Sequence, residues 1–308
     1  MNMKKSDTIL IFQKPELYFF PHLKDIVYPP YDRREKTPLY YIYRAMNLIK
    51  LPISSFFWGS WKNRIKDVKR IIIFDYGYQN CMEKYIKKVN PSCEVILFCW
   101  NKVDRVRTNG LKFPIRDKIY STDPGDCEKY GFKYNHIFYP TDLREDYKPE
   151  VSDKLYFIGS DKGRAKSLLY LKKYFEKSGL DVNISVLSQN RDPEYRKKYS
   201  EILIDQSLSY EEYISEVRSN GILLDICQSS QRAITMRVLE SVVYSKKLIT
   251  TNQEVRSFPF YNENNILVID LKSLPSIKEV KRFKEKPFVP YTDEQLYGIS
   301  VEHWLKGF

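Results

Sequence analysis

Short apolar runs alternate with segments of helical periodicity along most of the chain. In the second half, apolar runs at 154–159 and 221–227 have the length of buried strands, and helical spacing follows at 165–177 and 236–245. The same pattern in the first half predicts a helix at 79–89 and strands at 8–12, 70–74, 93–98, 118–121 and 136–139. Strands that alternate with helices build parallel sheets, so an α/β fold is predicted.

Two predicted helices begin with capping sequences. Ser209 and Glu212 have the spacing of a capping box, and a helix is predicted to follow Ser209 directly. This helix is predicted to end at 220–221, because an Asn-Gly pair suits a left-handed stop. Thr292 and Gln295 have the same capping spacing and predict a final helix near the end of the chain.

The loop after the 221–227 strand concentrates hydroxyl, amide and guanidinium groups. It lies between the carboxyl end of a strand and the amino end of a helix, where backbone N–H groups and the helix dipole favour an anion. Thr235 and Arg237 add a hydroxyl and a fork of donors, which suits a diphosphate. Glu240 lies one turn after Arg237, where it would either accept hydrogen bonds from sugar hydroxyls or pair with Arg237.

A second loop has the same design. The strand at 154–159 ends in Gly159, and a short loop with Gly163 and Arg164 leads into the next helix. The two glycines either let a phosphate approach the backbone or only shape a turn. Because this loop recurs with the Arg237 loop in one βαβ array, we expect two basic helix starts to face one pyrophosphate.

Three motifs carry a resemblance to a known family. They are YFIGSDKGR at 156–164, Ser-Leu-Ser-Tyr-x-x-Tyr from Ser207, and Gln-x-x-x-Thr-Met-Arg-x-x-Glu ending at Glu240. With these motifs the chain resembles the sugar-nucleotide half of a two-Rossmann (GT-B) glycosyltransferase, of the kind encoded for bacterial lipopolysaccharide core, O-antigen and capsule assembly. The likeness covers 150–270 well and the first half only by architecture.

The resemblance implies a fold, a reaction and a set of donor-binding residues. The fold would be two Rossmann-like domains that face each other across a cleft, with a C-terminal helix that packs back on the first domain. In the resembling family, the diphosphate is held by residues matching Lys162, Arg164, Thr235 and Arg237, the ribose by Glu240, and the base by loops at 187–189 and 206–208. The implied donor-binding set is Gly159, Lys162, Arg164, Ser188, Leu208, Gln228, Gln231, Thr235, Met236, Arg237 and Glu240.

The same resemblance divides the chain into three parts. Residues 1–148 would form an acceptor domain, 149–290 the nucleotide-sugar domain, and 291–308 the closing helix. A charged, proline-containing stretch near 140–151 is the expected hinge. The segment at 31–61 fits the strand and helix pattern poorly, so we interpret it as an insertion that shapes the acceptor cleft.

One departure from the family bears on the mechanism. Better-known retaining members carry Glu-x7-Glu, but position 232 is arginine here, so only Glu240 matches. Inversion is therefore favoured, and inversion needs a general base for the acceptor hydroxyl. Asp75, directly after the 70–74 strand, is the first choice. A strand-end aspartate is more often a turn or helix cap. The alternatives at equivalent strand ends are Asp104, Asp123 and Asp126.

No metal or cofactor is expected. No Asp-x-Asp occurs in the chain, and its three histidines, His22, His136 and His303, are scattered. The charge on the leaving diphosphate would be met by Arg164, Arg237 and helix ends instead. The prediction is an inverting hexosyl- or deoxyhexosyltransferase that uses a nucleotide-sugar donor and a lipid-linked or lipopolysaccharide-type acceptor.

Charge and cysteine content indicate where such an enzyme would work. The net charge is +12, and 32–70 holds ten Lys or Arg against three acids, interleaved with aromatic residues. Such a patch suits the anionic inner surface of a cytoplasmic membrane, although a solvated face over core aromatics is equally compatible. Five cysteines without a C-x-x-C pair, no signal peptide and no 18-residue apolar run favour a cytoplasmic, membrane-peripheral protein.

Two other functions are weaker alternatives. A nucleotide-sugar epimerase or dehydrogenase would need a dinucleotide site, but no G-x-G-x-x-G follows any predicted strand. A noncatalytic, membrane-associated glycan-assembly protein would use the basic aromatic patch alone. Nucleic acid is not expected as a partner, because no nucleic-acid-binding motif accompanies the charge.

Overall fold

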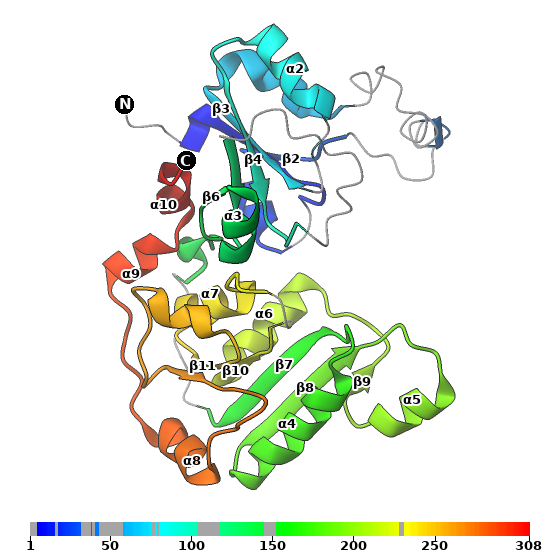
Figure 1. The fold of residues 1–308 in the computed structure, drawn as a ribbon, viewed down its shortest axis with the longest axis vertical. Coiled ribbons are helices and arrows are strands. Elements are labelled where there is room, and N and C mark those ends of the chain that lie inside the picture. The colour runs from blue at the N-terminus through cyan, green and yellow to red at the C-terminus, as the bar shows by residue number, and fades with distance from the viewer. Residues whose placement is uncertain are drawn as a thin grey trace. The chain divides into compact units, whose positions relative to one another are not determined.

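The chain forms two compact units, each with its own parallel sheet. The computed structural model describes residues 5–15, 18–31, 38, 41–42, 58–75, 78, 80–103, 118–144, 152–227 and 231–308. Met1–Ile137 and Glu302–Phe308 form one unit, and Phe138–Val301 form the other (Figure 1). Each unit contains a six-stranded sheet whose paired strands are all parallel. The predicted fold class of two Rossmann-like α/β domains is confirmed.

The sheet of the first unit has the strand order β2-β1-β3-β4-β5-β6. Its strands are β1 (Thr8–Ile11), β2 (Val27–Tyr28), β3 (Arg70–Phe74), β4 (Glu94–Cys99), β5 (Ile119–Ser121) and β6 (Lys133–Tyr134). Its helices include α2 (Asn80–Val89), α3 (Pro124–Tyr130) and the 3-10 segments η1 (Lys5–Asp7), η2 (Phe20–Leu23) and η4 (Ser60–Asp67). The order of the strands reverses between β1 and β3, and this position in an open α/β sheet is where ligands bind.

One strand prediction in this unit is wrong. Residues 136–139 were predicted as a strand, but β6 is at Lys133–Tyr134 and 135–140 have no regular structure. Tyr139 instead donates its backbone N–H to the carbonyl of Ile299 at 2.9 Å. The apolar residues of this run are buried, but an apolar run indicates only burial and does not specify a strand.

The C-terminal residues belong to the first unit. The predicted final helix is two helices, α9 (Asp293–Gly298), which begins with the predicted capping box, and α10 (Val301–Lys306). Arg70 at the start of β3 donates to the carbonyls of Leu305 at 2.8 Å and Phe308 at 3.2 Å. The Trp304 ring packs edge-on against the ring of Phe98 in β4, with centroids 5.0 Å apart. These contacts confirm that the C-terminal helix returns to the first domain.

The sheet of the second unit has the order β12-β11-β10-β7-β8-β9. Its strands are β7 (Lys154–Ser160), β8 (Asp181–Leu187), β9 (Leu203–Ile204), β10 (Ile222–Asp225), β11 (Lys247–Thr250) and β12 (Ile266–Val268). The chain moves outward from β7 through β8 to β9, and then returns to β10 on the other side of β7. This is the doubly wound order, and its switch point lies between β7 and β10.

The helices of this unit are α4 (Ala165–Lys177), α5 (Pro193–Tyr199), α6 (Tyr210–Ser219), α7 (Met236–Val243) and α8 (Ile277–Glu285), with the 3-10 segments η7 (Thr141–Arg144) and η8 (Gln253–Ser257). The predicted limits of α4 and the predicted start and capping box of α6 are confirmed. Within the described parts of the chain, no helix combines the length and the apolar content that crossing a bilayer requires.

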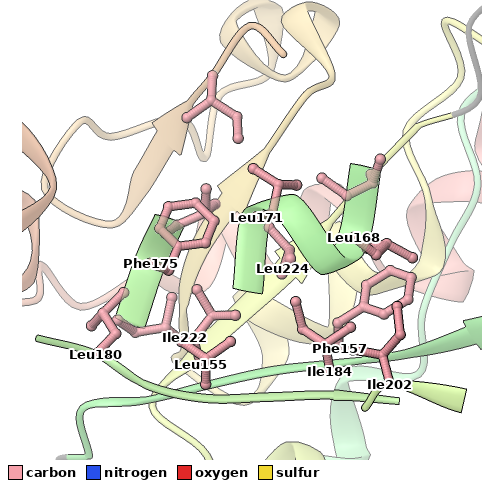
Figure 2. Close-up of a cluster of buried hydrophobic side chains, with 14 of the residues drawn as sticks. Leu155, Phe157, Leu168, Leu171, Phe175, Leu180, Ile184, Ile202, Ile222 and Leu224 are labelled. Atoms are coloured by element: carbon pink, nitrogen blue, oxygen red, sulfur yellow. The ribbon is translucent and has the colours of Figure 1, made fainter. Parts of the chain in front are cut away.

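The packing of α4 fixes one face of this sheet. Its apolar residues recur every three or four positions, which places them along one side of the helix. Figure 2 shows this side against side chains of the strands beneath it. Burial of each such side chain contributes roughly 2 kcal/mol. The labelled members include Leu168, Leu171 and Phe175 from α4 and Leu155, Phe157, Ile184, Ile222 and Leu224 from the strands.

The end of α6 differs from its prediction. Asn220 has φ −98° and ψ 147°, and Gly221 does not have a positive φ, so the predicted left-handed stop is wrong. Glycine is needed at 221 for another reason. A Cβ built there would lie 1.7 Å from the carbonyl oxygen of Ser152, because the two backbones nearly touch.

We expect Gly221→Ala to destabilise the second unit by more than about 2 kcal/mol, because the added methyl group cannot be accommodated without moving a backbone. Urea unfolding followed by circular dichroism measures the change. Gly298→Ala is the matched control, since a Cβ at that helical glycine meets no atom within 4 Å. Equal unfolding midpoints for Gly221→Ala and the wild type would contradict the close approach at Ser152.

Candidate functional site

The two loops that the sequence singles out lie together at the switch point of the second sheet. β7 and β10 are hydrogen-bonded neighbours, with Leu155 opposite Ile222. Their following loops are linked directly, because the Arg164 guanidinium donates through Nη1 to the carbonyl oxygen of Ile226 at 2.6 Å. The carboxyl ends of β7 and β10 therefore define one site.

The loop after β7 is a tight turn. The backbone N–H of Arg164 donates to the carbonyl of Asp161 at 2.8 Å, which closes the turn. Its central residues, Lys162 and Gly163, both have positive φ, at 47° and 78°. Two consecutive residues of this kind are typical of a type I′ turn. The turn ends at the amino end of α4, where Arg164 is the N-cap residue.

Asp161 anchors this turn, and the sequence had not singled it out. Its carboxylate accepts hydrogen bonds from the Ala165 N–H at 3.2 Å, the Ser188 hydroxyl at 2.8 Å and the Tyr195 hydroxyl at 2.5 Å. Burial alone would raise the pKa of Asp161, but the hydrogen bonds from Tyr195 and Ser188 outweigh it and lower that pKa. Ser188, predicted to bind the donor, thus lies at the carboxyl end of β8 as a partner of Asp161.

Arg164 holds the ends of two strands. Besides the bond to Ile226, its guanidinium donates through Nη2 to the carbonyl of Ser160 at 2.8 Å. A third and weaker bond runs from Nε to the carbonyl of Asp161 at 3.4 Å. Carbonyls at strand ends lack a partner in the sheet, so these bonds satisfy groups that would otherwise be exposed.

Arg237 lies beside Arg164. The two guanidinium carbons lie 4.9 Å and 5.4 Å from the centroid of the same Phe157 ring. Gly159 leaves room for this arrangement, because a Cβ there would lie 3.3 Å from Phe157 and 3.5 Å from Arg164 Nη2. Burial lowers the pKa of Arg164, and the charge of Arg237 lowers it further. The structure therefore brings together the two arginines that the sequence assigned to one diphosphate.

The bonding capacity of Arg237 is only partly used. Nη2 donates to the carbonyl of Ile158 at 2.6 Å, whereas Nε is buried without a hydrogen-bond partner among the described residues. No described carboxylate lies within 4.0 Å of either Arg164 or Arg237. Buried donors in native proteins are almost always bonded, so an unbonded guanidinium N–H at a switch point indicates a site for an anionic acceptor.

Asp225 organises the start of α7. It ends β10, and its two carboxylate oxygens accept hydrogen bonds from the Thr235 hydroxyl at 2.9 Å and the Thr250 hydroxyl at 2.8 Å. Thr235 is the N-cap residue of α7 but makes no side-chain cap, because its hydroxyl is turned to Asp225. Asp225 was not among the predicted site residues, although an acid at the end of an apolar run is a signal that the sequence contains.

Glu240 is buried beneath this site. Its side chain is 2% exposed and accepts a hydrogen bond from the Tyr213 hydroxyl of α6. Burial raises the pKa of Glu240 to about 7, against the opposing effects of the Tyr213 hydrogen bond and the Arg237 charge. The hydrogen-bond partner of Glu240 in the structure is thus Tyr213 rather than Arg237, and its binding to sugar hydroxyls stays a prediction.

The other predicted donor-binding residues have varied surroundings. Lys162 is exposed at the tip of the turn, and Met236 is the half-buried first residue of α7. Gln231 is half-buried in the loop before α7, whereas Gln228 lies outside the described residues. Leu208 lies at the edge of an open cavity of about 460 Å³ that is also lined by Ile158, the residue whose carbonyl Arg237 binds.

The candidate bases in the first unit are tied to backbone groups. Asp75 follows β3, is 5% exposed, and accepts hydrogen bonds from the backbone N–H and side-chain amide of Asn101 at 2.9 and 3.2 Å. Asp123 caps α3 through the N–H of Gly125 at 2.8 Å, and Asp126 accepts from the N–H of Val103 at 2.8 Å. Asp104 lies outside the described residues.

Known proteins resemble this chain only weakly, and only in structure. No protein-family model matches the chain, and no curated protein matches its sequence. A glycosyltransferase from Rickettsia africae ESF-5 superposes with a TM-score of 0.48 at 10% identity, over 92% of this chain and 84% of that chain. A protein assigned as a UDP-N-acetylglucosamine 2-epimerase from Listeria monocytogenes gives 0.41 at 12% identity, over 95% and 85%. Neither similarity is strong enough to indicate a function for this chain, so the function is inferred from the geometry of the site.

The pKa of Glu240 predicts a specific pH dependence of stability. Because the folded-state value is about 7 and the ordinary value is 4.5, the folded protein retains a proton that the unfolded chain releases between these values. Ionisation of Glu240 therefore lowers the free energy of unfolding as pH rises from about 4.5 to about 7, and the loss is constant at higher pH. Glu240→Gln should therefore match the wild type near pH 4 and be more stable by up to about 3 kcal/mol at pH 8.

Urea unfolding at a series of pH values measures this difference. Glu211→Gln, on the exposed side of α6, is the control and should follow the wild type throughout. A difference between Glu240→Gln and the wild type that stays constant from pH 4 to pH 8 would show that Glu240 does not titrate in the expected way.

Proposed function

We propose that this protein is a glycosyltransferase that takes a sugar from a nucleotide-sugar donor and holds the donor's diphosphate between Arg164 and Arg237. The observation that carries the proposal is the pair of guanidinium groups over Phe157, one of which has a buried N–H without a hydrogen-bond partner in the part of the chain that the structure describes. They lie at the switch point of a doubly wound sheet, which is the usual place for a nucleotide in such folds.

The electrostatics of the site favour an anion with more than one charge. Burial and the charge of Arg237 lower the pKa of Arg164; Asp225 acts in the opposite direction on both arginines, but no described carboxylate lies within 4.0 Å of either guanidinium. A diphosphate between them would replace the repulsion between the two guanidinium groups with charge-assisted hydrogen bonds, which are about twice as strong as neutral ones. The amino end of α7, which Thr235 does not cap, would add backbone N–H donors.

The same groups would assist the proposed reaction. The acceptor hydroxyl attacks the anomeric carbon, the bond from that carbon to the diphosphate oxygen breaks, and negative charge builds up on the leaving diphosphate. Arg164 and Arg237 would stabilise that charge. Attack from the opposite side inverts the anomeric carbon, and the proposal includes no metal ion or other cofactor. Asp75 is the proposed base, since it directly follows β3, where the order of the first sheet reverses.

The acceptor and the location are further parts of the proposal. We propose a lipid-linked or lipopolysaccharide-type acceptor of a bacterial surface glycan, in keeping with the motif resemblance, and peripheral attachment to the anionic inner membrane surface. Arg64, Lys66 and Lys69 are exposed in and after η4, around buried Trp61. Arg64 pairs with Asp67 and Lys69 pairs with Asp7, so a smaller excess of positive charge supports a basic surface there. Arg70 is buried and bound to Glu94, so it contributes to the fold and not to that surface.

Arg237→Ala should weaken the binding of a nucleoside diphosphate by roughly ten- to a hundredfold, because it removes a charged donor from the proposed diphosphate site. Isothermal titration with UDP, GDP, ADP and CDP identifies the preferred base in the wild type and then measures the loss in the variant. Arg256→Ala, at an exposed arginine in η8, is the control and should bind like the wild type. Unchanged affinity in Arg237→Ala would refute the proposed placement of the diphosphate.

Asp75→Asn should slow sugar transfer by about two to four orders of magnitude and leave nucleoside diphosphate binding intact, since a general base acts only on the acceptor hydroxyl. Release of nucleoside diphosphate from nucleotide sugars in the presence of acceptor glycans measures the rate. Thermal unfolding checks the fold of the variant, because Asp75 also binds Asn101. Full activity in a folded Asp75→Asn protein would exclude Asp75 as the base.

A further inference from the structure

An open cavity of about 460 Å³ lies on the face of the second sheet opposite α4. Its floor consists of two cross-strand pairs of β7 and β8, in which Tyr156 lies opposite Asn183 and Ile158 lies opposite Ser185. Side chains alternate between the two faces of a sheet, so these residues point away from the core under α4. The cavity is therefore separate from the packed face that stabilises the sheet.

The floor is polar where a parallel sheet is normally apolar. Strands inside such sheets are usually buried on both faces and carry aliphatic residues on each. In β8, Asp181 and Asn183 are exposed and Ser185 is half-buried, while the residues between them are buried. The Ser185 hydroxyl donates to Asn183 Oδ1 at 3.4 Å, and both side chains line the cavity with hydrogen-bonding groups.

Tyr156 provides the strongest indication of a ligand. Its side chain is only 2% exposed, and its hydroxyl has no hydrogen-bond partner among the described residues. Leaving a buried hydroxyl unbonded costs about 1–3 kcal/mol, and native proteins rarely tolerate it. Burial raises the pKa of Tyr156, and the charge of nearby Glu216 raises it further, so the hydroxyl stays protonated and able to donate.

The walls of the cavity indicate what kind of ligand it suits. Glu216 of α6 and Asp205 after β9, which Arg196 also binds, supply carboxylate oxygens that accept hydrogen bonds and repel anions. Ile204 and Leu208 supply aliphatic contacts. A lining of carboxylates, amides and hydroxyls beside aliphatic groups complements a molecule that carries many hydroxyl groups and no charge.

We propose that this cavity binds an uncharged, polyhydroxylated group, with the Tyr156 hydroxyl as its buried donor. Two sources carry this chemistry, a nucleoside and a saccharide unit. The nucleoside source rests on the proposed function, since Ile158 connects the cavity to Arg237. The saccharide source is independent of it, and in either case the ligand is recognised by its hydroxyl groups and not by phosphate.

The test uses uncharged probes with the full-length protein. Uridine, cytidine, adenosine and guanosine form one set, and glucose, galactose and N-acetylglucosamine form the other, each titrated to about tens of millimolar by calorimetry, a range suited to weak single-site ligands. At least one set should bind the wild type, and Tyr156→Phe should bind it roughly five- to tenfold more weakly, because one hydrogen bond is lost. Tyr170→Phe, at a tyrosine that is 59% exposed on α4, is the matched control.

One further variant and a measurement of stability keep the result interpretable. Ser185→Leu fills the cavity from a position outside the core and should also abolish binding, while Tyr156→Phe should unfold at the same temperature as the wild type or a higher one. Binding of nucleosides alone identifies a nucleoside site, and binding of saccharides alone identifies a sugar site. If no probe binds the wild type, or if Tyr156→Phe and Ser185→Leu both bind as the wild type does, the inference is overturned.

Arg237→Ala separates this inference from the proposed function. The affinity of this variant for the uncharged probe should be within about twofold of the wild-type affinity, because the guanidinium that it lacks is proposed to bind phosphate and not the uncharged group. If Arg237→Ala retains nucleoside diphosphate affinity while Tyr156→Phe loses the uncharged probe, the proposed function fails and the cavity site stands. If Arg237→Ala loses diphosphate affinity and no uncharged probe binds the wild type, the proposed function stands and the cavity inference fails.

Discussion

The guanidinium of Arg164 connects the carboxyl ends of β7 and β10 by donating to the carbonyls of Ser160 and Ile226. The rest of the candidate site depends on this connection. It fixes where the chain leaves each strand, and it positions the charge of Arg164 over Phe157 next to that of Arg237. Because the bonds go to neutral carbonyls, the positive charge is retained at the switch point, where an anionic ligand can use it.

The two arginines differ in how many hydrogen bonds they donate to the backbone. Arg164 makes three hydrogen bonds to backbone carbonyls and is therefore part of the local structure as well as of the proposed site. Arg237 makes one such bond, and its buried Nε–H has no hydrogen-bond partner among the residues that the structure describes. Nearby Asp225 and Glu240 accept hydrogen bonds from hydroxyl groups and form no ion pair with either arginine.

The site and the cavity are two parts of one region with different chemistry. Ile158 belongs to both, because Arg237 binds its carbonyl while its side chain lines the cavity. The arginine side favours phosphate, whereas the side with Glu216 and Asp205 disfavours it. A ligand that spans both would have a charged part and an uncharged hydroxylated part, and a nucleotide sugar has this composition.

The sequence by itself determined the α/β class, the limits of α4, the capping boxes of α6 and α9, and the polar loops after β7 and β10. These features depend on neighbours within a few residues, so local spacing specifies them. Tertiary structure decided the rest. Gly221 is required by Ser152, the 136–139 run is buried without being a strand, and Asp161 and Asp225 acquire their roles from partners distant in sequence. Such contacts form only when segments distant in sequence come together in the fold. The periodicity of the chain does not specify which backbones and side chains these will be.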